Sequence, residues 1–285
     1  MYSAKVENKD GEVFLLTGDE TRYQVLSIVG LNPTNAQINT VSTAGLDGAR
    51  YNSSKLKKKN IVITLKINGA VEQNRIFLYN YFRTKEWCRF YYSNDTRDVY
   101  IDGYVESVEV GIFSKKEKMQ ISIISPSSYF KALSEIISDI SNTLKLFTFP
   151  FSINENEPIP FSEYLENRIT RIYNDGESET GVVITVTFGD DVNAITIRNT
   201  TTGENFELDY AFVVGDVVTI NTNKGQKDVY LMRNGVKINM FPALKRGSVF
   251  FQLAAGINTF GYLADGAENK DIRIVFTYRN QYRGV

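Results

Sequence analysis

Hydrophobic and polar positions alternate over most of this chain, and a period of two is typical of β-strands with one buried face. The clearest run covers residues 61–67, where isoleucine or leucine occupies every second position. The same alternation recurs at residues 119–123, 182–188, 206–210 and 272–278. Short stretches rich in Gly, Asn, Asp and Ser separate the runs, as turns do. The pattern predicts a mainly β protein.

Two stretches depart from this period of two. Residues 71–85 place Ile76, Tyr79 and Phe82 at helical spacing, which predicts a short helix packed across a sheet. Residues 126–153 open with a proline, which is tolerated in a first helical turn but not in a central strand. An apolar stripe of helical spacing follows, formed by Tyr129, Leu133, Ile136, Ile137 and Ile140. We therefore expect a second helix here.

The second stretch also divides the chain. After the helical stripe, Phe147, Phe149 and Phe151 alternate around a proline, which indicates extended chain. A length of 285 residues suits two domains of ordinary size. We expect an N-terminal β domain at residues 1–125, a linker of helix and strand at 126–153, and a C-terminal β domain at 154–285.

Residues 30–54 form the longest stretch without strand alternation in the first half. They are rich in Gly, Asn, Thr and Ser, which predicts a long loop or arm. A loop of that length in a compact domain usually has a function or reaches a neighbour. We therefore expect this segment to have a function or to reach a neighbour.

The C-terminal half carries six or more short strand patterns with turn signals between them, which is typical of a β-sandwich. Asn174-Asp175-Gly176 marks one turn. Asn234-Gly235 marks another, and this dipeptide is the one preferred in two-residue hairpins.

Composition removes several classes of function. The chain has no histidine, the commonest general base and metal ligand, so no histidine-based triad or zinc site is possible. Its one cysteine, Cys88, has no base of the usual kind beside it, and we expect it to pack in the core. No signal-peptide core or apolar stretch of membrane-spanning length is present, so we expect a soluble protein made in the cytoplasm, without a membrane partner.

Charged residues offer two further candidate sites. Lys55, Lys57, Lys58 and Lys59 are able to contact phosphate, but lysines also protect strand ends from edge pairing, and aromatic residues are not interleaved with them. With a net charge of −1, we expect no specific nucleic-acid partner.

The acidic candidates are the pairs Asp190 with Asp191 and Asp209 with Asp216. They lack the spacing of a calcium loop, and aspartate is common in turns. A carboxylate pair for sugar hydrolysis stays open, because only the separation of the two groups in space decides it. No phosphate-binding loop or nucleophile elbow is present. We predict no catalytic, cofactor-binding or metal-binding residues, no cofactor and no enzymatic activity.

The order of several motifs resembles that of the distal tail proteins of long-tailed bacteriophages, also called phage tail family or siphovirus-type tail component proteins. In the first half the likeness runs through Arg75, Leu78-Tyr79, Tyr91-Tyr92, Arg97, Ile101-Asp102-Gly103-Tyr104-Val105, Phe113, Gln120-Ile121-Ser122-Ile123, Ser125-Pro126 and Tyr129-Phe130. In the second half it runs through Phe149-Pro150-Phe151, Asn174-Asp175-Gly176, Ile197-Arg198-Asn199, Thr202-Gly203, Gly215-Asp216, Ile220-Asn221-Thr222, Gly225, Asn234-Gly235, Leu253, Gly256 and Asn258.

The likeness has departures. The family commonly has Cys-Pro-Asp-Pro-Tyr-Phe at the hinge, whereas this chain has Ser125 for the cysteine and Ser127-Ser128 for Asp-Pro. Phe250 stands near a position where the family often has tryptophan.

The resemblance implies a structural protein of the virion tail tip, synthesised in the bacterial host. Its N-terminal domain would be a split-barrel or sandwich-like ring domain with a short helix, and six copies would form a ring at the end of the tail tube. A galectin-like C-terminal sandwich would anchor baseplate parts. The implied partners are further copies of the chain, the tail tube protein, the tail hub or tail-associated protein and a receptor-binding protein.

A carbohydrate-binding module or adhesin for host attachment is the alternative. A sandwich with many tyrosines suits sugar binding, since aromatic rings stack on sugar faces. The single tryptophan lies in the other half, which argues against this function.

Overall fold

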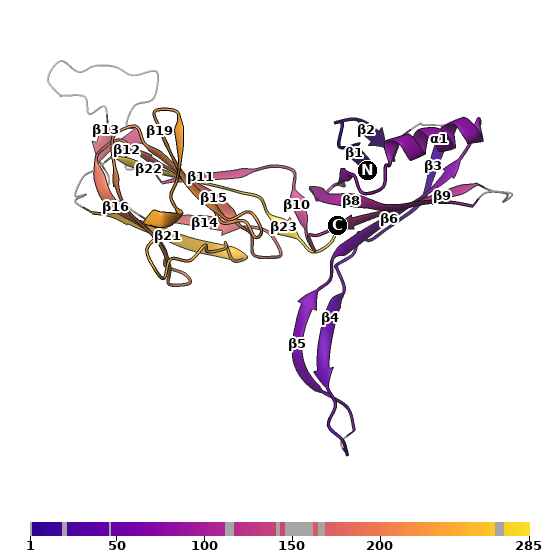
Figure 1. Cartoon of the computed structure of the whole chain (residues 1–285), viewed down its shortest axis with the longest axis horizontal. Coiled ribbons are helices and arrows are strands. Elements are labelled where there is room, and N and C mark those ends of the chain that lie inside the picture. Colours follow the sequence, from indigo (N-terminus) through magenta and orange to yellow (C-terminus); the bar gives the residue numbers. More distant parts are fainter. Residues whose placement is uncertain are drawn as a thin grey trace. The chain divides into compact units, whose positions relative to one another are not determined.

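The computed structural model describes residues 2–18, 22–45, 47–111, 117–140, 143–145, 162–164, 169–265 and 271–285. Antiparallel strands dominate them, so the mainly β prediction is confirmed (Figure 1). The chain divides into two compact units: Met1–Ser134 with Gln281–Val285, and Glu135–Asn280. The second unit is thus inserted between the body of the first unit and its C-terminal residues.

The first unit is built on one nine-stranded sheet whose main path runs β2-β1-β7-β8-β9-β6-β3. Strand β10 pairs with β8 on one side and with β23 on the other. The strands are β1 (Ser3–Asn8), β2 (Val13–Leu15), β3 (Tyr23–Val29), β6 (Lys59–Ile67), β7 (Trp87–Ser93), β8 (Asp98–Val110), β9 (Lys118–Ser125), β10 (Phe130–Ala132) and β23 (Gln281–Tyr282).

Helix α1 (Val71–Tyr81) covers one face of this sheet, as the helical spacing of residues 71–85 predicted (Figure 1). It buries Leu78 and Tyr81 against the sheet. The hydroxyl of Tyr81 lies 2.7 Å from the carbonyl oxygens of both Val6 and Glu12, so the ring is anchored as well as packed. Burial raises the pKa of this hydroxyl, which keeps it a donor.

The core under the helix follows the alternation seen in the sequence. Every second side chain of β6 points inward, and Ile61, Ile63 and Leu65 are fully buried. Gly103 on β8 permits close packing there, because an added Cβ would lie 2.8 Å from a methyl carbon of Ile123. The core is therefore a continuous layer of aliphatic and aromatic side chains.

The prediction of a helix within residues 126–153 is wrong for the part that the structure describes. Residues 130–132 form β10, and residues 136–140 form β11 (Ile136–Ile140), which pairs with β22 (Ile272–Tyr278) of the second unit. Ile136 packs on the core of that unit whereas Ile137 is exposed, so the apolar residues follow a period of two. β-branched side chains favour strands, and β22 supplies the hydrogen-bonding edge. Phe147, Phe149 and Phe151 lie outside the described residues.

The second unit is a β-sandwich of a six-stranded and a four-stranded sheet. The six-stranded sheet has the order β11, β22 (Ile272–Tyr278), β15 (Val182–Phe188), β18 (Val217–Asn221), β19 (Asp228–Arg233) and β20 (Val236–Asn239). The four-stranded sheet has the order β14 (Ile169–Asn174), β21 (Gly256–Ala264), β16 (Val192–Asn199) and β17 (Glu204–Phe212). A short pair, β12 (Thr143–Lys145) with β13 (Ser162–Tyr164), and a 3-10 turn, η1 (Phe241–Ala243), complete the unit.

The two sheets share one core. Phe260 on β21 and Phe276 on β22 meet across it with ring centroids 4.9 Å apart. The predicted Asn234-Gly235 hairpin turn joins β19 to β20, and both residues have positive φ values of 50° and 78°. Asn174 at the other predicted turn is buried and donates to the carbonyl oxygens of Ser178 and Leu253. Among the described residues, no helix is long and apolar enough to cross a membrane.

Phe130 offers a test of how the chain leaves the first unit. Its side chain is fully buried, and its strand pairs with the returning β23. We expect Phe130→Ala to lower the free energy of unfolding of the first unit by about 3–5 kcal/mol, because a large buried ring is lost. The sole tryptophan, Trp87, lies in this unit, so its fluorescence in a denaturant titration reports on that unit.

Leu133→Ala serves as the control for Phe130→Ala. Leu133 is half-exposed, so its truncation should change the same free energy by less than about 1 kcal/mol. Equal effects of the two variants would show that Phe130 is not part of the core of the first unit.

Cys88 gives a second test of the same core. The thiol is buried, and this burial raises its pKa to about 12, with the nearby Asp102 adding to the shift. We expect it to react with a maleimide at pH 8 at least about 100-fold more slowly in the native protein than in denaturant. A cysteine placed by Thr96→Cys in a Cys88→Ser background is exposed and should react at the unfolded rate. Fast labelling of native Cys88 would contradict the packing described here.

Candidate assembly surface

The arm predicted at residues 30–54 exists, but it is a β-hairpin rather than a loop. Strands β4 (Ala36–Val41) and β5 (Arg50–Leu56) pair only with each other, in a two-stranded sheet separate from the main one. Every residue of both strands is exposed. Figure 1 shows the hairpin running away from the sheet of its own unit, as a continuation of the ends of β3 and β6. A hairpin with no core beneath it is marginal in water on its own.

The two faces of this arm differ in chemistry. Ile38 and Leu56 point to one face, and Ser54, the cross-strand partner of Ile38, points to the same face. The hydroxyl of Tyr51 lies 2.9 Å from Ser54 Oγ, so Tyr51 is on this face as well. These three apolar side chains are 41–63% exposed. The opposite face is mainly polar, with Val41 near the tip as an exposed apolar residue, and Asn39 Nδ2 donates there to Ser53 Oγ at 3.0 Å. We call the side with Ile38, Tyr51 and Leu56 the apolar arm face.

The root of the arm is fixed by a buried lysine. Lys59 Nζ donates to the carbonyl oxygens of Asn32 at 2.8 Å, Arg283 at 3.2 Å and Gly30 at 3.4 Å. The same ammonium group lies 4.6 Å from the centre of the Phe130 ring. Burial lowers the pKa of Lys59 to about 8. One side chain thus joins the arm, the outgoing strand and the C-terminal residues.

Backbone and hydroxyl contacts complete the root. Gly30 has a φ of 98°, and a Cβ there would lie 2.0 Å from Asn60 O, so only glycine fits. Thr34 donates to Ser128 O at 2.8 Å, and Ser128 donates to Lys57 O at 2.7 Å. These contacts fix the direction in which the arm leaves the first unit.

Helix α1 presents a second apolar surface. Ile76, Phe77 and Tyr79 face outward and are 38–49% exposed. The Phe77 ring stacks on Tyr23 and on Tyr81, with centroids 6.4 and 6.3 Å apart. Through Phe77, the exposed side of the helix is in contact with the buried aromatic rings of the core.

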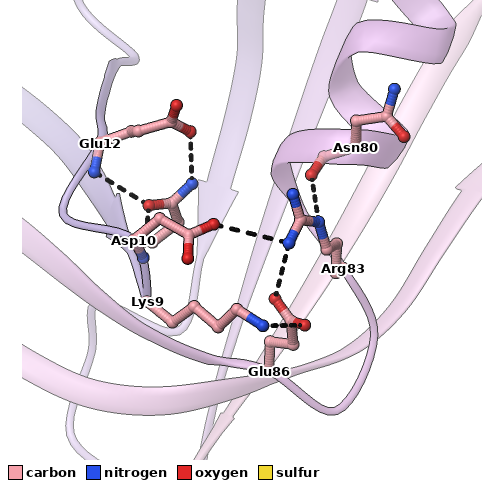
Figure 2. A network of polar contacts seen from close by, with 7 residues as sticks. Lys9, Asp10, Glu12, Asn80, Arg83 and Glu86 are labelled. Carbon is pink, nitrogen blue, oxygen red and sulfur yellow. Dashed lines mark hydrogen bonds and ion pairs between the residues drawn. The ribbon is translucent and has the colours of Figure 1, made fainter.

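A network of charges ties the turn between β1 and β2 to the segment that follows α1 (Figure 2). Arg83 lies between Asp10 and Glu86, at 3.5 and 3.8 Å, and its Nε donates to Asn80 O. Lys9 reaches Glu86 from the other side at 2.5 Å. All four charged side chains are partly exposed, so each pair alone contributes little to stability. Together they fix the end of the helix at the sheet edge.

The basic cluster does not form one surface. Lys55, Lys57 and Lys58 are exposed at the base of the arm, while Lys59 points inward to the carbonyl groups described above. This division has no local signature in the sequence, because the acceptors of Lys59 come from distant parts of the chain.

Three of the four acidic candidates accept hydrogen bonds from backbone amides or form an ion pair. Asp190 accepts from the amide of Asp271, and Asp191 accepts from the amide of Val214. Asp216 is buried and bound by the Arg233 guanidinium at 2.9 and 2.5 Å, whose hydrogen bonds lower the pKa of this carboxyl. Asp209 lies exposed on β17. Within the described ranges, no group of three or more Cys, Asp or Glu side chains is placed to hold a metal ion.

Two family models match the chain, one in each unit. Residues 9–125 match the phage tail protein RIFT-related domain, and residues 175–282 match the C-terminal domain of the siphovirus-type tail component. The matched ranges follow the division into two units and cover most of the chain. Comparison with curated proteins finds no similar sequence.

Solved structures from phages share the fold over nearly the whole length. The Dit protein of phage SPP1, described as a paradigm of the hub adsorption apparatus in phages that infect Gram-positive hosts, is 15% identical. Its TM-score is 0.69, with 98% of this chain and 99% of that chain covered. A chain of the phage P2 baseplate in its activated conformation with calcium is 13% identical, with a TM-score of 0.56 and full coverage of both chains. The corresponding strontium structure gives a TM-score of 0.53 at 13% identity, covering 96% of this chain and 98% of that one.

Identities this low establish the fold, and the two family models add the sequence relationship in both units. The chain therefore belongs to the siphovirus-type tail component family, the distal tail proteins of bacteriophages.

Proposed function

We propose that this protein is a non-enzymatic building block of the tail tip of a phage or phage-derived particle. Six copies of the first unit form a ring at the end of the tail tube. The second unit, a galectin-like sandwich, carries baseplate or receptor-binding parts. The partners are further copies of the chain, the tail tube protein, the tail hub protein and a receptor-binding protein. The names of the similar solved structures, a hub adsorption apparatus and a baseplate, support this assignment.

The observation that carries the proposal is the apolar arm face. Ile38, Tyr51 and Leu56 form an apolar surface with no part of the described chain packed on it. Burying such a surface in a contact would be favourable by about 25 cal/mol per Å² of apolar area removed from water. Because the root of the arm is fixed by Lys59, the arm points away from its own unit and is suited to cover a neighbouring copy.

A ring requires two different surfaces on each copy, since every subunit contacts its neighbours head to tail. The apolar arm face supplies one surface. The exposed side of α1, with Ile76, Phe77 and Tyr79, is a second apolar area of the same unit. Fixed geometry at the arm root then sets the rotation between neighbours, and with it the number of copies that close a ring.

The described acidic groups also support a structural role. Asp190 and Asp191 accept from the backbone amides of Asp271 and Val214, and Asp216 is neutralised by Arg233. A buried carboxylate held by a guanidinium is a poor general acid or base, because its lowered pKa leaves it without a proton to donate and makes it a weak base.

Charge on the apolar arm face should break the assembly. We expect the double variant Ile38→Asp with Leu56→Asp to weaken self-association at least about tenfold, because unpaired carboxylates would be buried in the contact. Native mass spectrometry of the concentrated protein measures the ring, and incorporation into tail particles gives a second readout.

The matched control places the same charges on the polar side of the same hairpin. Gln37→Asp with Ser53→Asp adds two carboxylates at exposed positions of β4 and β5 and should leave the ring and its incorporation unchanged. If both double variants assemble equally well, the apolar arm face is not a subunit contact.

A further inference from the structure

The outer face of the four-stranded sheet is more apolar than a solvent-facing sheet requires. Ile169 and Tyr173 on β14, with Ile257 and Leu263 on β21, are each 59–61% exposed. Single exposed apolar residues are normal, but a contiguous group on neighbouring strands is a mark of a binding surface.

The strand register places all four side chains on one side. Ile169 and Tyr173 alternate with Ile172, which is buried in the sandwich core, so both point outward. Tyr173 lies directly opposite Ile257. Ile169 lies opposite Gly261, two residues from Leu263 on the same face of β21. We call this surface the β14–β21 face.

Two arginines lie on the same side of this sheet. Arg171 stands between Ile169 and Tyr173 on β14, and Arg198 on β16 lies opposite Gly261. Both are exposed, and neither has an ion pair with a described residue. The β14–β21 face is therefore apolar and positively charged.

The carboxylates of the sheet lie on the far strand. Glu207 on β17 is bound by Lys245 at 2.5 Å, and Asp209 follows it on the same strand. Glu204, the third carboxylate of this strand, accepts from the hydroxyl of Thr202. None of the three forms an ion pair with Arg171 or Arg198, so the positive charge beside the apolar residues is not paired within the described sheet.

The other sheet of the sandwich gives an internal comparison. Its outer face mixes threonines with apolar residues: Thr185 lies directly opposite Thr219, and Thr277 lies opposite Val183 and Ile137. The arginine on this face, Arg273, is paired with Asp139 at 2.7 Å. The four-stranded sheet differs because its exposed apolar residues lie beside two arginines that have no ion pair with a described residue.

We propose that the β14–β21 face is the docking site for a segment of another tail protein that carries apolar side chains flanked by carboxylates. Apolar residues of that segment would cover Tyr173 and Leu263, and its carboxylates would pair with Arg171 and Arg198. A self-complementary contact between two copies of this face would bring like charges together, which disfavours it. The inference rests on the proposed function only in taking the partner from the tail.

Photocrosslinking in assembled particles tests the site. A benzophenone amino acid replaces Tyr173 in protein that is assembled into tails in the host, and purified tails are irradiated and analysed by mass spectrometry. We expect a crosslink to one segment of a different tail protein, with Asp or Glu beside apolar residues. The same probe in place of Val236, an equally exposed residue of the same unit, should not reach that segment.

Charge reversal is the second part of the experiment. Arg171→Glu with Arg198→Glu should lower the crosslink yield from position 173 at least about threefold, because attraction becomes repulsion. Arg246→Glu, at an exposed position outside the four strands of this sheet, should leave the yield unchanged.

Several results would overturn the inference. One is a crosslink only to another copy of this chain, and another is a crosslink only within the chain, for example to residues 146–161. The third is no crosslink in tails that contain the protein. The fourth is a crosslink yield that charge reversal does not alter. If the protein is absent from purified tails, the proposed function fails and the inference fails with it. Presence in the ring without the crosslink removes the inference alone.

Discussion

The buried ammonium group of Lys59 is the interaction on which the first unit and its arm depend. Removing a charge from water is costly, and here no carboxylate offsets the cost among the described contacts. Three carbonyl oxygens and the face of Phe130 take the place of water instead. Because the carbonyl groups belong to Gly30, Asn32 and Arg283, the arm root and the C-terminal residues are held by the same group. Loss of either segment would leave a buried charge with too few acceptors, so the two segments stabilise each other.

This constraint links the fold to assembly. The second unit is inserted between β10 and β23, and these two strands pair with each other beside Phe130. The chain therefore leaves and re-enters the first unit at the place where the arm begins. The amphipathic arm has a fixed root, and the sandwich has one apolar, positively charged sheet face. These are two separate surfaces, which we propose bind different partners. Such a division suits a protein that joins a tail tube to peripheral parts.

Much of this architecture could be predicted from the sequence, because local alternation decides it. The strand at residues 61–67, the helix beginning at Val71 and the Asn234-Gly235 turn follow from short-range patterns. The helix expected after Pro126 failed because an apolar stripe of isoleucines also suits a strand, and the deciding partner, β22, lies far along the chain. The role of Lys59 was hidden for the same reason, since one acceptor is 224 positions away. The arm was expected, but its two faces emerged only from the pairing of β4 with β5.

We propose that the apolar arm face is covered by a neighbouring copy in a ring at the tail tip. Electron cryomicroscopy of the assembled tail tip tests it most directly. We expect six copies of the first unit around the tail axis, with Ile38, Tyr51 and Leu56 of each copy buried against the next copy. A tail tip in which these three side chains face solvent, or in which the chain occurs as isolated peripheral copies, would contradict it.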